Sequence, residues 1–264
     1  MTYSTIRTAI DARGVATLTL ARPEVHNAMN GEMYDEARAA VAAFQGSSSV
    51  RAIVLTGEGR SFCAGGDLKY QRQQAARPQK ERIAEASKLA LWLRELDQLS
   101  KPLIGRINGA AYAGGLGLIS VCDVAIGLSD ATFAITEARL GLLPGMISPY
   151  VVRRLGISNA RRYFLTGRPF SGERAAELGL LDEAVTPDEL DAAVAAEVDL
   201  VLGCAPGALT AAKRLIDYVA HHPFEDNLVY TVDRVAEMWS WEEAAEGMAS
   251  FAEKRKPAWA VPRT

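Results

Sequence analysis

The stretches SFCAGGDL at residues 61–68 and NGAAYAGGLGL at residues 108–118 consist almost entirely of small residues. Each lies between a segment with strand character and a segment with helix character. Small residues at such a junction let backbone N–H groups approach a ligand closely, and a helix N-terminus favours negative charge. Two converging amides form an oxyanion hole, so the pair predicts a site that stabilises a developing negative charge on oxygen.

Outward from these stretches, strand and helix patterns alternate. Strands are predicted at 50–56 and 102–107, each running into one of the small-residue stretches, and helices at 29–44 and 83–99 precede them. Residues 3–10 and 15–21 predict a hairpin, and further short strands are predicted at 123–127 and 132–136. This alternation favours an α/β core with parallel strands.

Beyond Leu140 the pattern is mostly helical. Ser148 followed by Pro149 resembles a helix start, and residues 186–189 and 240–243 match the capping-box pattern. We therefore expect a core over 1–186 and a C-terminal helical region over 187–264, in a single structural domain. Walls of a binding pocket are expected from residues 71–88 and from the helices after Gly145.

Composition narrows the function classes. The 264 residues carry a formal net charge of -3, with 49% hydrophobic and 23% charged residues, so neither nucleic acid nor a membrane is an expected partner. Cys63, Cys122 and Cys204 are an odd number at scattered spacings, which indicates neither a disulfide framework nor a metal site. With no signal-peptide pattern in the first twenty positions, we expect a cytoplasmic location.

Several motifs together resemble the crotonase, or enoyl-CoA hydratase/isomerase, family: RPEVHNA at 22–28, GRSFCAGGDL at 59–68, AGG at 113–115, CD at 122–123 and FAEKRKP at 251–257. They occur in order over nearly the whole chain. The resemblance implies a spiral of ββα units followed by a C-terminal helical region. It also implies homotrimers, which often pair into hexamers.

The resemblance further implies an acyl-CoA site. In it the amides of Ala64 and Gly114 hold the thioester oxygen, and coenzyme A is part of the substrate, with no separate cofactor. The residues that the resemblance assigns to CoA binding are Val25, Ala28, Gly65, Gly66, Asp67, Leu68 and, toward the nucleotide phosphates of a neighbouring subunit, Lys254. From the sequence alone, Asp67 also reads as a helix N-cap.

Standard hydratases of this family carry two catalytic glutamates. The position of the first falls on Gly117 in this chain, and the position of the second falls on Glu137. An apolar environment from Ile135, Leu140 and Leu142 is expected to raise the pKa of Glu137 and suit it to act as general acid and base. Tyr112, Ser148 and Tyr150 are the polar candidates to orient a water molecule.

A single carboxylate leaves the reaction open. Residues 145–155 together with Gly117 look most like the branch that hydrates methylglutaconyl-CoA and related branched or carboxylated enoyl-CoAs, in fatty acid or branched-chain amino acid catabolism. Hydration is therefore favoured over isomerisation of the double bond, which needs one base and no water. Decarboxylation and a non-catalytic acyl-CoA-binding role are the remaining alternatives.

Overall fold

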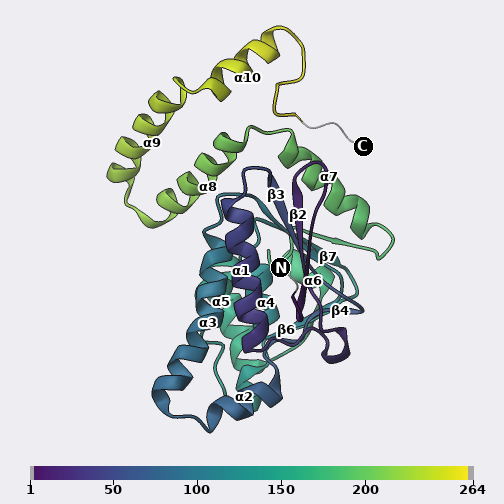
Figure 1. Cartoon of the computed structure of the whole chain (residues 1–264). Coiled ribbons are helices and arrows are strands. Elements are labelled where there is room, and N and C mark those ends of the chain that lie inside the picture. Colours follow the sequence, from purple (N-terminus) through teal and green to yellow (C-terminus); the bar gives the residue numbers. More distant parts are fainter. Residues whose placement is uncertain (1–2, 261–264) are drawn as a thin grey trace.

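The computed structural model describes residues 3–260 (Figure 1). Its strands form two sheets. The larger has the order β1-β2-β3-β5-β7-β10 and the smaller the order β4-β6-β8-β9. The strands are β1 Ile6–Ile10, β2 Val15–Leu20, β3 Ala52–Gly57, β4 Ser61–Cys63, β5 Leu103–Ile107, β6 Ala110–Tyr112, β7 Val124–Leu128, β8 Thr132–Ala134, β9 Phe170–Ser171 and β10 Glu183–Val185.

The helices follow the strands in chain order. They are α1 Gly31–Gly46, α2 Leu68–Ala75, α3 Gln79–Asp97, α4 Gly114–Ser120, α5 Ser148–Thr166, α6 Gly172–Glu177, α7 Leu190–Leu202, α8 Pro206–His221, α9 Phe224–Met238 and α10 Glu242–Ala252, with short 3-10 turns η1 Pro23–Val25 and η2 Glu137–Leu140. Among the described residues, no single helix is long and apolar enough to cross a membrane, and only the pair α7 and α8, bent by 102°, reaches that length and composition together.

Three successive units build the core. In each, one strand enters the larger sheet, the next enters the smaller sheet, and a helix follows: β3, β4 and α2; β5, β6 and α4; β7, β8 and η2. Within both sheets these strands pair in parallel, with Ile53 opposite Leu103 and Ala111 opposite Phe133. The predicted spiral of ββα units is confirmed.

Two apolar clusters hold the layers together. The main cluster packs α1, α3, α4 and α5 around both sheets, with Trp92, Phe62 and Phe133 fully buried in it. A second cluster joins α7 to the outer face of the larger sheet, where Val194 and Val198 meet Ile104 and Ile126. Thus α7 covers the core, whereas α8, α9 and α10 form a separate layer that touches the core through α8, where Lys213 pairs with Asp123 at 2.5 Å (Figure 1). We call these three helices the C-terminal arm.

Local sequence patterns predicted the helices and strands more accurately than they predicted the helix caps. The hairpin of β1 and β2 is confirmed, with Tyr3 outside the strand. Ser148 is not a cap, because the N-cap is Ile147 and the Ser148 hydroxyl donates to the carbonyl of Gly145 at 2.9 Å.

Of the two predicted capping boxes, one is half formed and the other is wrong. The N–H and hydroxyl of Thr186 donate to the Glu189 carboxylate at 3.0 and 2.7 Å, while α7 begins only at Leu190. The Ser240 hydroxyl donates to the carbonyl of Glu237 and gives α10 no cap. The Glu243 carboxylate instead accepts N–H bonds from α8.

Candidate active site

The two small-residue stretches meet in space. Gly65 has φ +87°, and a Cβ on it would lie 2.8 Å from the carbonyl oxygen of Tyr112 and 3.4 Å from the amide nitrogen of Gly114. A Cβ on Gly114 would lie 2.4 Å from Cε of Met29. A side chain at Gly65 would clash with the opposite loop, whereas one at Gly114 would meet the end of the Met29 side chain. At Gly65, glycine is therefore required both by the close approach of the two backbones and by the left-handed turn.

The free amides at this junction belong to Gly66 and Gly114. The N–H of Gly114 is the first of α4, where no intrahelical acceptor exists, and no side chain caps this helix. Gly66 lies between two peptide groups that pair with Met29, at 2.7 and 2.8 Å. Its own N–H has no acceptor among the described residues. Ala113, just before Gly114, has φ +50°, an unfavourable conformation for a residue with a Cβ.

The prediction that Ala64 supplies an oxyanion donor is wrong. The N–H of Ala64 donates to the carbonyl of His26 at 2.9 Å, so it is already used in pairing the two chain segments. Because Gly65 adopts a left-handed conformation, the chain turns between Ala64 and Gly66. The amide available to a ligand is two residues further along than the resemblance implied.

Next to this junction lies a cavity of about 750 Å³. Its walls come from α2, from α3, from the loop before α4 and from residues 136–147. The predicted site residues that line it are Ala64, Gly66, Leu68, Tyr112, Gly114 and Glu137. The predicted site residues that do not line it are Val25, Ala28, Gly65, Asp67, Gly117, Ser148, Tyr150 and Lys254.

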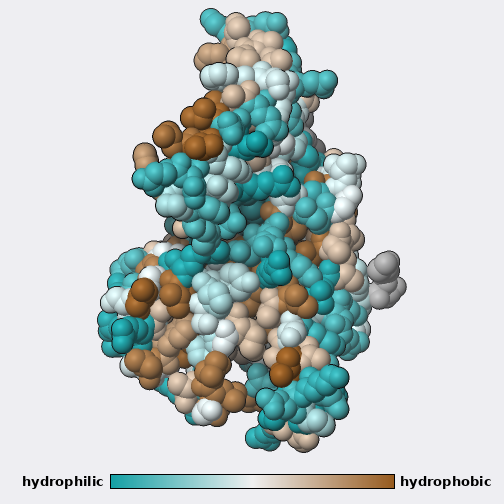
Figure 2. Space-filling model, turned by 90° about the vertical axis from the view of Figure 1, so that its left-hand side faces the viewer, coloured by the Kyte–Doolittle hydropathy of each residue, from teal (hydrophilic) through white to brown (hydrophobic). Residues whose placement is uncertain are grey.

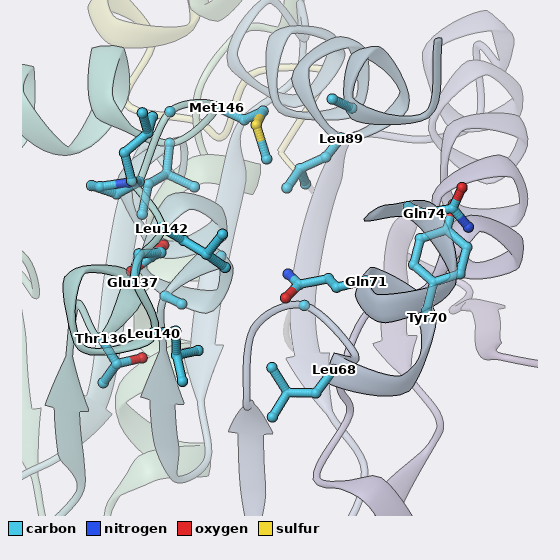
Figure 3. A pocket seen from close by; sticks show the side chains of 18 of the residues that line it. Leu68, Tyr70, Gln71, Gln74, Leu89, Thr136, Glu137, Leu140, Leu142 and Met146 are labelled. Atoms are coloured by element: carbon cyan, nitrogen blue, oxygen red, sulfur yellow. The ribbon is translucent and has the colours of Figure 1, made fainter. Parts of the chain in front are cut away.

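Glu137 begins η2 and presents its carboxylate to the cavity (Figure 3). One of its carboxylate oxygens is buried and has no hydrogen-bond partner among the described residues. Burial raises the pKa of Glu137, and hydrogen bonds from its own backbone N–H and that of Thr136 oppose the rise only in part. A half-buried carboxylate with a raised pKa and an unused oxygen is suited to exchange protons with a ligand.

A second carboxylate has no room at position 117. A Cβ on Gly117 would lie 2.4 Å from Cγ2 and 3.0 Å from Cβ of Ile147, and 3.5 Å from Cδ1 of Leu93. Ile147 is 2% exposed and precedes α5. The space that a longer side chain would need is therefore filled by a well-packed isoleucine.

Two of the three candidates for holding water lie outside the cavity. Ser148 bonds to Gly145, and the Tyr150 ring has the Arg153 guanidinium 5.6 Å from its centroid. Tyr112 alone of the three lines the cavity.

The remaining predicted residues have other surroundings. Asp67 caps α2, accepting the N–H groups of Lys69 and Tyr70 at 2.9 and 3.1 Å, and pairs with Arg22 at 3.0 Å, which confirms it as an N-cap. Lys254 is exposed just after α10. Cys63 is fully buried, and burial raises the pKa of its thiol to about 12, so it is a packed and unreactive residue.

The predicted pocket wall at residues 71–88 is confirmed, although none of its polar residues was singled out from the sequence. Two turns of α2 and the first turns of α3 supply Tyr70, Gln71, Gln74, Arg82 and Glu85. Their sequence signal is weak, because polar residues on a helix usually face solvent. Only the spacing of Arg82, Glu85 and Leu89 on one face of α3 hints at a shared surface.

Comparison with known proteins agrees with this geometry. The family model described as enoyl-CoA hydratase/isomerase matches residues 11–262. A short-chain-enoyl-CoA hydratase of Clostridium acetobutylicum is 29% identical over 244 residues, which is 92% of each chain. An enoyl-CoA hydratase from Shewanella pealeana has a TM-score of 0.93 and 35% identity, covering 97% of this chain and 96% of that one. Pseudomonas aeruginosa AtuE has a TM-score of 0.94 and 36% identity, covering 98% and 100%. This chain belongs to the enoyl-CoA hydratase/isomerase, or crotonase, family.

Proposed function

We propose that this enzyme adds water across the 2,3 double bond of a short, branched or carboxylated enoyl-CoA of the methylglutaconyl-CoA kind. The observation that carries the proposal is the unpartnered, half-buried carboxylate of Glu137 in the same cavity as the free amides of Gly66 and Gly114. Coenzyme A enters as part of the substrate, and its binding follows from membership of the family.

The proposed reaction runs through a thioester enolate. The N–H groups of Gly66 and Gly114 hold the thioester oxygen, while ionised Glu137 takes a proton from water. The water oxygen bonds to C3, and the electrons of the double bond move through C2 onto the thioester oxygen. Glu137 then returns its proton to C2. Loss of one such oxyanion donor typically costs about 3 kcal/mol of barrier.

Isomerisation of the double bond is the second candidate. The closed position at Gly117 supports it, because moving a proton between C2 and C4 needs one carboxylate and no bound water. A non-catalytic role in binding acyl-CoA is a third reading, motivated by the same missing carboxylate.

Incubation in water labelled with heavy oxygen distinguishes these candidate functions. A hydratase incubated with a 2-enoyl-CoA in this solvent gives labelled 3-hydroxyacyl-CoA by mass spectrometry, while an isomerase moves the double bond without taking up oxygen. Glu137→Gln should lower kcat by about 10²- to 10⁴-fold. Glu173→Gln, exposed on α6 and outside the cavity, is the matched control. Turnover of the Glu137→Gln variant within a few-fold of wild type would show that the assigned role is wrong.

We also propose that the chain functions as a homotrimer, or as a hexamer of two trimers. The C-terminal arm exposes large apolar side chains that a monomer would leave in water, and Figure 2 shows apolar residues gathered on this upper part of the molecule. The most exposed are Phe251 at 87%, Phe224 at 76% and Trp239 at 72%. In such an assembly Lys254 would reach the CoA phosphates of a neighbouring subunit.

A further inference from the structure

The cavity has one polar wall and one apolar wall. The polar wall is formed by Tyr70, Gln71, Gln74, Arg82 and Glu85 of α2 and α3, and the apolar wall by Leu140, Leu142, Leu143, Pro144, Met146 and Ile147. Figure 3 shows Gln71 pointing from α2 toward the side where Glu137 and Leu142 lie. A purely hydrocarbon acyl chain would leave the polar wall without hydrogen-bond partners, which is unfavourable once water is displaced.

Part of the polar wall is already satisfied within the protein. The Tyr70 hydroxyl donates to the Glu85 carboxylate, which also lies 3.4 Å from the ammonium of Lys88. Lys88 in turn pairs with Asp35 at 2.7 Å. These contacts join α2 to α3 and offset the negative charge of Glu85.

Arg82 and Gln74 have no such partners. Among the described residues, Arg82 is the only lysine or arginine that lines the cavity. It is exposed, and none of the described acidic side chains forms a salt bridge with it. The side-chain oxygen of Gln74 is buried and lacks a donor among the described residues. The Gln71 carboxamide lines the cavity as well, with its nitrogen 2.2 Å from where a Cβ of Gly66 would be. The wall thus offers the Arg82 guanidinium and the Gln71 amide as hydrogen-bond donors, and the Gln74 oxygen as an acceptor.

The place of Arg82 on α3 suits a short acyl chain. Leu89, on the same face of α3, has Cδ2 3.9 Å from where a Cβ of Gly114 would be, so this part of α3 lies beside the oxyanion site. Arg82 is two helical turns earlier, about 10 Å along the helix axis. A chain whose thioester oxygen binds at Gly114 and which extends along α3 would bring its far end toward Arg82.

We infer that the cavity selects acyl-CoAs whose acyl chain ends in a carboxylate, with Arg82 as the residue that recognises it. A guanidinium pairs with a carboxylate through two parallel N–H bonds, which gives strength and a fixed orientation. The apolar wall packs against the hydrocarbon part of the chain. The inference rests on the proposed acyl-CoA site and names the chemical feature that the site selects.

Binding of saturated acyl-CoAs tests the selection without requiring catalysis. Isothermal titration with glutaryl-CoA and hexanoyl-CoA compares chains of similar length that differ in the terminal carboxylate. We expect the wild type to bind glutaryl-CoA at least tenfold more tightly, and Arg82→Gln to abolish that preference while leaving the Kd for hexanoyl-CoA within about twofold. Arg82→Lys should keep part of the preference, since it keeps the charge but not the planar fork.

Arg72→Gln is the matched control, because Arg72 is exposed on α2, outside the cavity, and loses the same charge. The inference is overturned if the wild type binds both ligands equally, if Arg82→Gln weakens both by the same factor, or if Arg72→Gln removes the preference equally well. A protein that keeps the preference but hydrates no enoyl-CoA would overturn the proposed hydratase activity and leave this inference standing.

Discussion

Gly117 and Ile147 together define how this active site departs from a two-carboxylate design. The Ile147 side chain packs where a side chain at position 117 would begin, so the absence of a carboxylate there is built into the core. Restoring a glutamate would require moving Ile147 as well. The site therefore depends on Glu137 as its one unpartnered carboxylate.

A double-mutant cycle tests this packing. Gly117→Ala should destabilise the protein by about 1–3 kcal/mol through overpacking. Ile147→Ala removes Cγ2 and should itself cost about 2–5 kcal/mol. The double variant should lose clearly less stability than the sum of the two single losses, because each change relieves the crowding caused or left by the other. Strict additivity in urea unfolding would show that the two positions do not compete for space.

The raised pKa of Glu137 predicts the shape of the pH profile. The reaction needs the ionised carboxylate, and burial disfavours that form. The acidic limb of kcat/KM should therefore lie above the ordinary glutamate pKa of 4.5. Measuring kcat/KM with a short 2-enoyl-CoA at closely spaced pH values locates this limb. A limb at or below the ordinary value would contradict the burial effect.

The same shift predicts a stability change in Glu137→Gln. Below the unfolded-state pKa, Glu137 is protonated in both states and contributes no difference. As pH rises, the unfolded chain ionises first while the folded pKa is higher, so the wild type loses stability through that interval. The variant should accordingly be more stable than the wild type at neutral pH, with the difference vanishing in acid below the ordinary pKa. Urea unfolding at both pH values measures it, and an equal difference at both would contradict the linkage.

At the scale of elements, α10 is tied back to the start of α8. The Glu243 carboxylate accepts the N–H groups of Gly207 and Ala208 at 3.0 and 3.1 Å, which satisfies two free donors of α8 and places negative charge at its positive end. Beside it, Trp259 donates its indole N–H to the carbonyl of Gly203 at 3.1 Å. These contacts hold α10 and the residues after it against the start of α8.

Glu243→Ala should therefore destabilise the start of α8 by about 1–2 kcal/mol. Hydrogen exchange of the amides of Gly207 and Ala208 should accelerate, while exchange in the β-sheets stays unchanged. Glu242→Ala removes a neighbouring exposed glutamate of the same helix and serves as the control. Equal acceleration in both variants would show that the cap is not specific to Glu243.

The sequence predicted what depends on local pattern. Apolar periodicity and small-residue junctions located β3, β5, α1 and α3 to within a few residues, and their alternation predicted a parallel α/β core. The ββα order was implied by the family resemblance. The sequence did not predict the long-range contacts. The choice of Gly66 over Ala64 depends on pairing with residues 26–29, and the partner of Glu243 lies in another helix. Neither relation leaves a periodic signal in the chain.

At the scale of the whole molecule, the C-terminal arm exposes large apolar side chains to solvent in the single chain. On α9, Leu228, Val232 and Val235 are 57%, 60% and 49% exposed, and Trp239, which caps its C-terminus, is 72% exposed. Their spacing places them on one face of the helix. The opposite side of α9 is partly used within the chain, since Tyr230 stacks on Tyr218 of α8 at 3.7 Å. An apolar stripe left in water on one side of a packed helix favours contact with another copy of the chain.

A charge placed in this stripe should disrupt the assembly. Light scattering coupled to size exclusion should give a mass of three or six chains for the wild type, whereas Val232→Glu should shift it toward the monomer because burying an unpaired carboxylate is costly. Asp233→Lys changes the charge more, at a polar position of the same helix, and should leave the mass unchanged. A monomeric wild type would contradict the proposed oligomer. An unchanged mass for Val232→Glu would show that subunits associate through a surface other than this face of α9.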